Sequence, residues 1–135
     1  MINRYLETKF HSPPLRSESV ARPRLVDRLQ QGLCVGCKLS LISAPAGYGK
    51  TTLVTEWLHT LSDTNSDICV AWLSLDEADN DPARLLGYWL TALMRKDKTM
   101  GHSAMSLLNM PQIPPTTAIL DEFINELSWS EKRFI

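Results

Sequence analysis

The 135-residue sequence predicts an α/β fold with a parallel sheet and flanking helices. Two observations lead to this fold class. Short apolar segments of strand length, Lys38–Pro45 and Ile68–Asp76, alternate with segments whose apolar residues recur at helical spacing. In addition, a turn that contains glycines, "SAPAGYGK", connects the first of these strands to a helix. The length and the 44% hydrophobic composition support one domain with a real core.

The composition narrows the classes of partner. Acidic and basic residues nearly balance, with a formal net charge of -1, so nothing in the charge favours contact of this segment with DNA or an acidic membrane. No apolar run approaches the ~20 residues of a membrane-spanning helix, and the first residues lack the apolar core of a signal peptide. We therefore expect no membrane partner and a cytoplasmic location, in which Cys34, Cys37 and Cys69 are reduced thiols.

The amino-terminal residues differ in character from those that follow. Residues 1–23 are polar and contain Pro13, Pro14 and Pro23, which favours an extended arm over a helix. From Arg24 to Leu33 the apolar residues recur at helical spacing and glycines follow. This segment is predicted to form a short first helix.

The middle of the chain predicts two strands separated by a helix. Lys38–Pro45 is short and apolar and is followed at once by turn residues, which predicts a buried strand. A helix is predicted from about Lys50 to Leu61, with one apolar face made of Leu53, Val54, Trp57, Leu58 and Leu61. The second apolar segment, Ile68–Asp76, ends in acids and predicts a second strand.

Two further helices are predicted in the second half of the chain. Asp81 is a suitable cap for a helix that starts at Pro82 and continues to Met94, because proline fits the first helical position. A last helix is capped by Thr116 or Thr117.

The segments that flank this last helix have different characters. Between the two helices, residues 96–115 show no sustained period and predict a loop with a helical turn around Ala104–Leu108. After the last helix, Arg133–Ile135 has the character of the start of a strand.

The turn "APAGYGKT", Ala44–Thr51, carries the groups that bind a nucleotide phosphate. Such a loop needs backbone N–H groups that converge on an anion, a lysine for the terminal phosphates and a hydroxyl for Mg²⁺. Ala44 stands where the strict pattern has its first glycine. The sequence predicts binding of a nucleoside triphosphate with Mg²⁺, held by Thr51 through the nucleotide. The predicted nucleotide-binding residues are Ala46, Gly47, Tyr48, Gly49, Lys50, Thr51 and Thr52.

The stretches "VARPRLVDRL", "LISAPAGYGKTTLVTEW" and "AWLSLDEADNDPARLLGYWLTAL" together cover much of the chain. With them the sequence resembles the amino-terminal ATPase region of MalT-like, LuxR-type transcriptional regulators, a branch of the STAND ATPases. The resemblance implies a P-loop NTPase fold and an ATP/ADP switch that uses Mg²⁺. It also implies inducer-dependent self-association of the full-length parent and a helix-turn-helix DNA-binding domain far towards the carboxyl terminus.

The resemblance also implies how the chain is organised. Residues 1–23 are expected to be an amino-terminal arm, and residues 24–135 a partial P-loop NTPase domain. In this family the acidic (Walker B) strand after the third helix typically begins with residues like "RFI", which here are Arg133–Ile135. We therefore interpret the chain as an amino-terminal fragment that ends before the acidic residues of that strand.

The expected function is that of an ATP-binding switch module, at most a slow regulatory ATPase in the full-length parent. Self-association belongs to that parent, and direct DNA contact from this segment is not expected. Two alternatives stay open from the sequence. One is a catalytic P-loop enzyme such as a small-molecule kinase, although residues 96–115 contain no arginine of the kind that a kinase lid uses. The other is an inactive remnant.

Candidate ligand contacts outside the loop fall in two places. The "ARPRL" segment resembles residues that lie near the adenine in the family, so Val20, Arg22 and Arg24 either contact the base or ribose or form a solvated entry to the first helix. Asp76 and Asp79 follow the second strand, at the sheet edge where α/β proteins bind ligands. They are candidates for nucleotide or Mg²⁺ contact, with structural roles as the alternative.

The remaining conspicuous residues have simpler interpretations. Cys34 and Cys37 form a C-x-x-C pair without a second pair to complete a zinc site, so a surface turn is expected. Cys69 is expected in the strand core. Three scattered histidines, His11, His59 and His102, are expected at the surface. Three tryptophans lie on apolar faces and are expected in the core: Trp57, Trp72 and Trp89.

Overall fold

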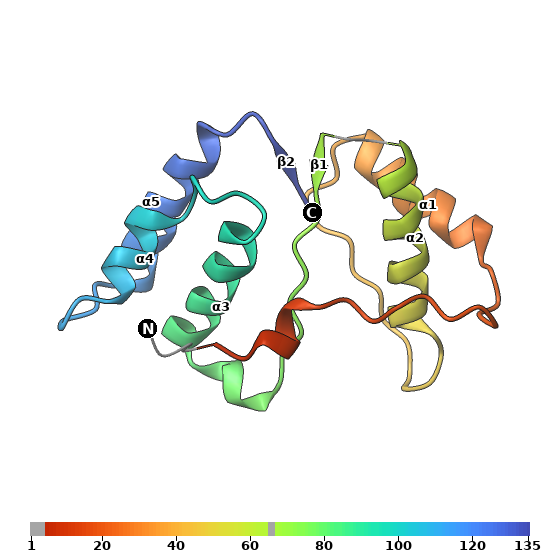
Figure 1. The fold of residues 1–135 in the computed structure, drawn as a ribbon, viewed down its shortest axis with the longest axis horizontal. Helices are drawn as coiled ribbons and strands as arrows, with labels where there is room; N and C mark the ends of the chain where they lie inside the picture. Colours follow the sequence, from red (N-terminus) through yellow and green to blue (C-terminus); the bar gives the residue numbers. More distant parts are fainter. Residues whose placement is uncertain (1–4, 65–66) are drawn as a thin grey trace. The chain divides into compact units, whose positions relative to one another are not determined.

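The computed structural model describes residues 5–64 and 67–135, and the chain divides into two compact units. The α1–α2 unit is Ser12–Ser66, and the α3–α5 unit combines Met1–His11 with Asp67–Ile135. Figure 1 shows the course of the chain within each unit.

The α1–α2 unit contains two helices that pack against each other. α1 spans Pro23–Cys34 and α2 spans Lys50–Thr64, so both helices predicted for this part of the chain are confirmed and are slightly longer than expected. The indole Nε1 of Trp57 donates to the side chain of Gln30 at 3.3 Å, which links the two helices. The buried apolar residues of the unit are Val26, Leu53, Trp57 and Leu61.

The predicted strand at Lys38–Pro45 is wrong for the structure. Within the described residues this segment is irregular and belongs to no strand ladder. Leu39 and Leu41 are 81% and 86% exposed, and only Ile42 is partly buried. An extended segment becomes a strand only when a neighbour satisfies its backbone groups. The two strands that form in the described residues pair with each other instead.

The α3–α5 unit has a core built by three helices (Figure 1). α3 spans Pro82–Met94, α4 spans His102–Leu108 and α5 spans Thr116–Ser128. The predicted helices and the helical turn around Ala104–Leu108 are therefore confirmed. The buried core is made of Leu86, Leu90, Leu93, Ala104, Leu108, Ile119 and Phe123.

The beginnings of these helices follow local capping rules to different extents. The Asp81 side chain accepts a hydrogen bond from the Arg84 N–H at 2.7 Å, which confirms the predicted cap of α3. α5 differs, because the residue before it is Pro115 and Thr116 is already helical, so the predicted threonine cap is wrong. The reason is local, since the backbone of Pro115 accepts the first-turn bond from Ala118.

A two-stranded parallel sheet pairs the beginning of the segment Asp67–Ile135 with its end. β1, Ile68–Cys69, pairs with β2, Arg133–Phe134, with Ile68 opposite Arg133. The prediction that Arg133–Ile135 begins a strand is confirmed, and so is the parallel pairing of an α/β chain. The strand predicted over residues 68–76 is too long, because only two of its residues have ladder partners. Further on, Ser74 donates its N–H to the Lys9 carbonyl instead.

The first described residues belong to the α3–α5 unit. A single 3-10 turn, Glu7–Phe10, interrupts the extended course predicted for the arm. Phe10 is 8% exposed, and its ring lies 5.8 Å from that of Tyr88 on α3. Buried aromatic contacts of this kind hold the segment on the unit.

None of the helices in residues 5–64 and 67–135 combines the length and apolar character that crossing a membrane requires.

Replacing Ile119 by alanine should destabilise the α3–α5 unit by about 2 to 5 kcal/mol, because the side chain is 1% exposed and its loss leaves a cavity in the core. The matched control is Ile124→Ala on the same helix, where the side chain is 59% exposed and the expected change is within about 0.5 kcal/mol. Urea unfolding followed by circular dichroism measures both. Equal losses for the two variants would contradict the assignment of the core.

Candidate functional site

Residues Ala44–Gly49 form a tight loop that leads directly into α2, which begins at Lys50. Gly47 and Gly49 have φ angles of 82° and 78°, in the left-handed region that glycine adopts without steric cost. Both glycines therefore adopt a backbone conformation that other residues rarely take. Because α2 begins at Lys50, the positive end of its dipole faces the loop.

The Lys50 side chain folds back onto its own loop. Its Nζ donates to the Ala44 carbonyl at 2.6 Å and to the Pro45 carbonyl at 3.0 Å. Both acceptors are neutral, and hydrogen bonds between ionised partners are about twice as strong as neutral ones. An anion at the loop can therefore take the place of these carbonyls as the partner of the ammonium group.

The other predicted nucleotide-binding residues are accessible. Thr51 and Thr52 are exposed in the first turn of α2, and Ala46 is exposed in the loop. Tyr48 is 62% exposed. The hydroxyl of Thr55 donates to the Thr51 carbonyl at 2.9 Å. The exposed Thr51 side chain lies on the same helix turn as Lys50.

A cavity of about 580 Å³ lies beside the loop, within the α1–α2 unit. One wall comes from arm residues 16–20 and Arg22, and the other from Gly47, Gly49 and the side of α2. Val20 and Arg22 therefore line the same cavity as the two glycines of the loop, and their contact with a base or ribose stays a prediction. Arg24 is exposed in the first turn of α1 and is not among the residues that line this cavity.

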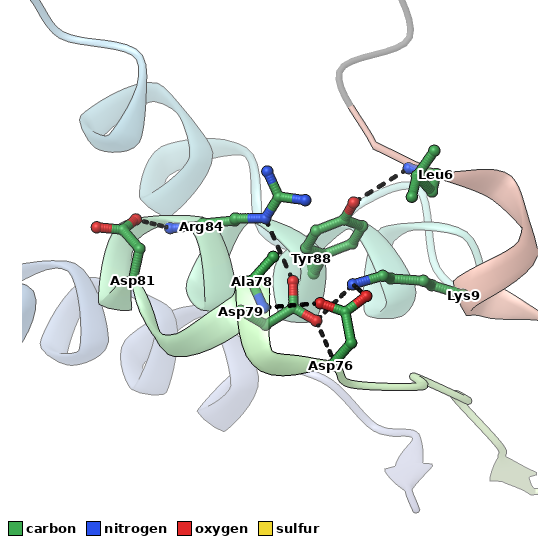
Figure 2. A network of polar contacts seen from close by, with 8 residues as sticks. All are labelled: Leu6, Lys9, Asp76, Ala78, Asp79, Asp81, Arg84 and Tyr88. Carbon is green, nitrogen blue, oxygen red and sulfur yellow. Dashed lines mark hydrogen bonds and ion pairs between the residues drawn. The ribbon is translucent and has the colours of Figure 1, made fainter.

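Figure 2 shows that the acidic residues after β1 form a network of polar contacts with Lys9. The Lys9 Nζ lies 2.5 Å from the Asp79 carboxylate and 2.8 Å from that of Asp76. Asp79 is 4% exposed and also accepts from the Arg84 Nε at 3.3 Å. Asp76 in turn accepts from the Ala78 N–H. Of the two roles left open for these acids, the structure therefore shows the structural one.

The network explains the ionisation of its acids. Hydrogen bonding from Lys9 lowers the pKa of Asp79 to about 2, and the same donor lowers the pKa of Asp76. Both carboxylates are therefore charged at neutral pH and already carry a cationic partner. The described residues contain no group of three or more histidine, cysteine or acidic side chains arranged to hold a metal ion.

Sequence reasoning missed Lys9, because residues 1–23 were interpreted as a polar arm. Lys9 is 6% exposed and lies 4.8 Å from the centre of the Tyr88 ring. The available signal was the spacing of Leu6 and Phe10 on either side of it, four residues apart. Their common partner is the buried Tyr88, about eighty positions further along the chain. No local sequence pattern reveals a contact over that separation.

The cysteine pair and the tryptophans lie partly as predicted. Cys34 ends α1 and Cys37 follows its turn, and both thiols are free and exposed. Cys69 lies in β1 but is only partly buried. Trp57 is buried and Trp72 is half-buried, whereas Trp89 is 50% exposed, so its predicted core position is wrong. Its ring lies on α3, with its centre 6.5 Å from that of the buried Phe123. The three histidines are exposed, as predicted: His11, His59 and His102.

Comparison with known proteins finds relatives that share one name, HTH-type transcriptional regulator MalT. The chain is 31% identical to the protein of Vibrio cholerae serotype O1 over 124 residues, which are 92% of the chain and 13% of that relative. It is 33% identical to the protein of Serratia proteamaculans over 133 residues, 96% of the chain and 14% of the relative. The protein of Cronobacter sakazakii is 40% identical over 101 residues, 75% of the chain and 10% of the relative.

These similarities show that the chain corresponds to one region of proteins with this name. More closely, it is a MalT-like regulator region, and it spans only 10 to 14% of the length of the three relatives. No protein-family model matches the chain, and no solved structure matches it either.

Replacing Asp79 by asparagine should flatten the acid dependence of stability. The folded-state pKa of about 2 lies below the ordinary value near 3.9, so the carboxylate stabilises the folded state above about pH 4, and this stabilisation is lost as the pH falls towards 2. We expect a smaller fall of the unfolding temperature between pH 5 and 2 in the variant than in the wild type. Some acid dependence remains, because Thr99 and Lys132 also lower the pKa of Asp97 to about 2.

The matched control for Asp79→Asn is Asp121→Asn on the exposed side of α5. It should reproduce the wild-type acid dependence, measured by thermal unfolding at a series of pH values. Parallel curves for the wild type and Asp79→Asn would contradict the structural role of the Asp79 carboxylate.

Proposed function

We propose that the chain is the ATP-binding switch module of a MalT-like, LuxR-type transcriptional regulator, belonging to the amino-terminal part of that regulator. The single observation that carries the proposal is the loop before α2. It joins two left-handed glycines to a lysine at the first helical position, within a chain that is similar to MalT regulators. The name of these relatives supports the regulatory role, and the loop supports the nucleotide.

The residues present fit a nucleoside triphosphate. The backbone of Ala46–Lys50 curves around the amino-terminal end of α2, where N–H groups and the helix dipole favour phosphate. Lys50 holds neutral carbonyls that phosphate oxygens replace. We assign the hydroxyl of Thr51 to Mg²⁺, which joins the site with the nucleotide and neutralises phosphate charge.

The base and ribose have a place beside the loop. The 580 Å³ cavity is large enough for a nucleoside and contacts Gly47 and Gly49 on one side and Val20 on the other. We assign Val20 to the base or ribose. Thr52, Leu53 and Glu56 complete the wall on α2. ATP and ADP then differ only at the phosphate loop, which suits a switch in which binding, and at most slow hydrolysis, is the useful event.

The wider activity belongs to the full-length parent. We propose that nucleotide binding here promotes self-association of that parent in the cytoplasm, and that DNA contact comes from another part of it. The balanced charge of this segment, -1 overall, is consistent with a segment that makes no DNA contact of its own.

Replacing Lys50 by alanine should weaken ATP binding by about 100-fold or more, since the loop loses the cation that holds the phosphates. Lys38→Ala, which removes an exposed lysine of the same unit, is the control and should leave the affinity unchanged. A fluorescent ATP analogue measures both. Equal affinities for Lys50→Ala and the wild type would refute the phosphate role of the loop.

Replacing Thr51 by alanine should reduce the gain in affinity that Mg²⁺ gives, and should change binding of the metal-free nucleotide much less. The physical reason is that the exposed Thr51 hydroxyl is the proposed metal ligand. Titrations with and without Mg²⁺ separate the two effects. If affinity falls equally in both conditions, the threonine acts through packing of the helix turn and not through the metal.

A further inference from the structure

We propose that Arg22 is a positioning residue of the phosphate loop, whose guanidinium fixes the orientation of the Tyr48–Gly49 peptide. The inference rests on the proposed function, because it concerns how the loop meets a phosphate. It departs from the expectation that Arg22 contacts the base or ribose, since here Arg22 acts on the loop itself.

The contact between Arg22 and the loop is direct. The Nη1 of Arg22 donates to the Tyr48 carbonyl at 2.8 Å. The guanidinium also lies against Gly49, where a Cβ would come within 3.3 Å of Nη2 and 3.4 Å of Nη1. The guanidinium therefore approaches the loop this closely because Gly49 has no side chain.

The held carbonyl controls the direction of a neighbouring N–H. In a trans peptide the C=O of one residue and the N–H of the next belong to one rigid plane and point in opposite directions. A donor that binds the Tyr48 carbonyl from one side therefore aims the Gly49 N–H towards the other. No peptide bond in the described residues is cis, so this relation holds at Gly49.

Without such a donor, this peptide unit has unusual freedom. Gly49 tolerates φ angles of either sign, so rotation of the Tyr48–Gly49 plane meets little steric resistance. A rotated plane would present the carbonyl in place of the N–H, and a carbonyl oxygen repels phosphate. The hydrogen bond from Arg22 selects the orientation that favours an anion.

Arg22 is itself held at the junction of both helices. It is the residue before α1, and its carbonyl accepts from Leu25 and Val26 at 3.0 and 3.1 Å. Its N–H lies 3.4 Å from each carboxylate oxygen of Glu56 on α2. The Arg22 side chain therefore starts from a fixed point of the packed helix pair, from which it can hold the Tyr48–Gly49 peptide in one orientation. We call its hydrogen bond to the Tyr48 carbonyl the tether.

The first arm of the test observes the loop without any ligand. Nuclear magnetic resonance of the ¹⁵N-labelled chain reports the φ angle of Gly49 through its amide coupling constant. Arg22→Ala should give a coupling averaged between two orientations, with a broadened Gly49 signal. Arg22→Lys, which keeps a donor, should restore much of the wild-type signal. Circular dichroism verifies that each variant keeps its helices.

The second arm compares Mg-ATP with inorganic tripolyphosphate, which has no base or ribose. If Arg22 positions the loop, Arg22→Ala should weaken binding of both ligands by about tenfold. Arg28→Ala, an exposed arginine further along α1, is the control and should change neither affinity. The comparison separates an effect on the phosphate loop from an effect on the base.

The outcomes that would contradict the tether differ from those that would contradict the proposed function. If Arg22→Ala binds tripolyphosphate as the wild type does, the tether is wrong while the proposed function stands, and a loss confined to ATP assigns Arg22 to the base or ribose. An unchanged Gly49 coupling in Arg22→Ala also overturns the tether. If the wild-type chain binds neither ligand, the proposed function fails, and the tether fails with it.

Discussion

Backbone polar groups that need partners are the constraint on which this structure depends. Where two extended segments meet, the strands satisfy each other, as β1 and β2 do. Where no strand is adjacent, side chains take over: Lys50 donates to the carbonyls of Ala44 and Pro45, and Arg22 to that of Tyr48. The residues around the loop are therefore hydrogen-bonded even though the segment before it lies outside any ladder.

The charged residues serve the two units in different ways. In the α3–α5 unit, Lys9 and Asp79 are buried together and paired with each other, which ties the segment Glu7–Phe10 to the turn just before α3. A buried charge without a partner is costly, so neither residue is free to take a ligand without loss of stability. In the α1–α2 unit, the cation Lys50 holds neutral carbonyls. Such partners are readily exchanged for an anion, and this difference is why we place the ligand at the loop and not at the acids.

Similarity to MalT regulators and the geometry of the loop support different parts of the functional proposal. The relatives establish a regulator region but say nothing of a nucleotide. The loop carries the proposed phosphate site but does not by itself define a regulator. Together they favour a nucleotide-dependent switch over the kinase that the sequence left open. Arg22 links α1 to this loop, because it is the residue before α1 and its guanidinium donates to the Tyr48 carbonyl.

The sequence by itself determined what depends on neighbours along the chain. Helical periodicity located the helices, Asp81 and Pro82 defined the start of α3, and the glycine spacing defined the loop. Only the tertiary structure decided what depends on distant partners. It left residues 38–45 without a ladder, shortened the strand after residue 67 to two residues, and buried Lys9 against Asp79. The physical reason is that a helix satisfies its own backbone within four residues, whereas a strand or a buried charge needs a partner that sequence patterns do not identify.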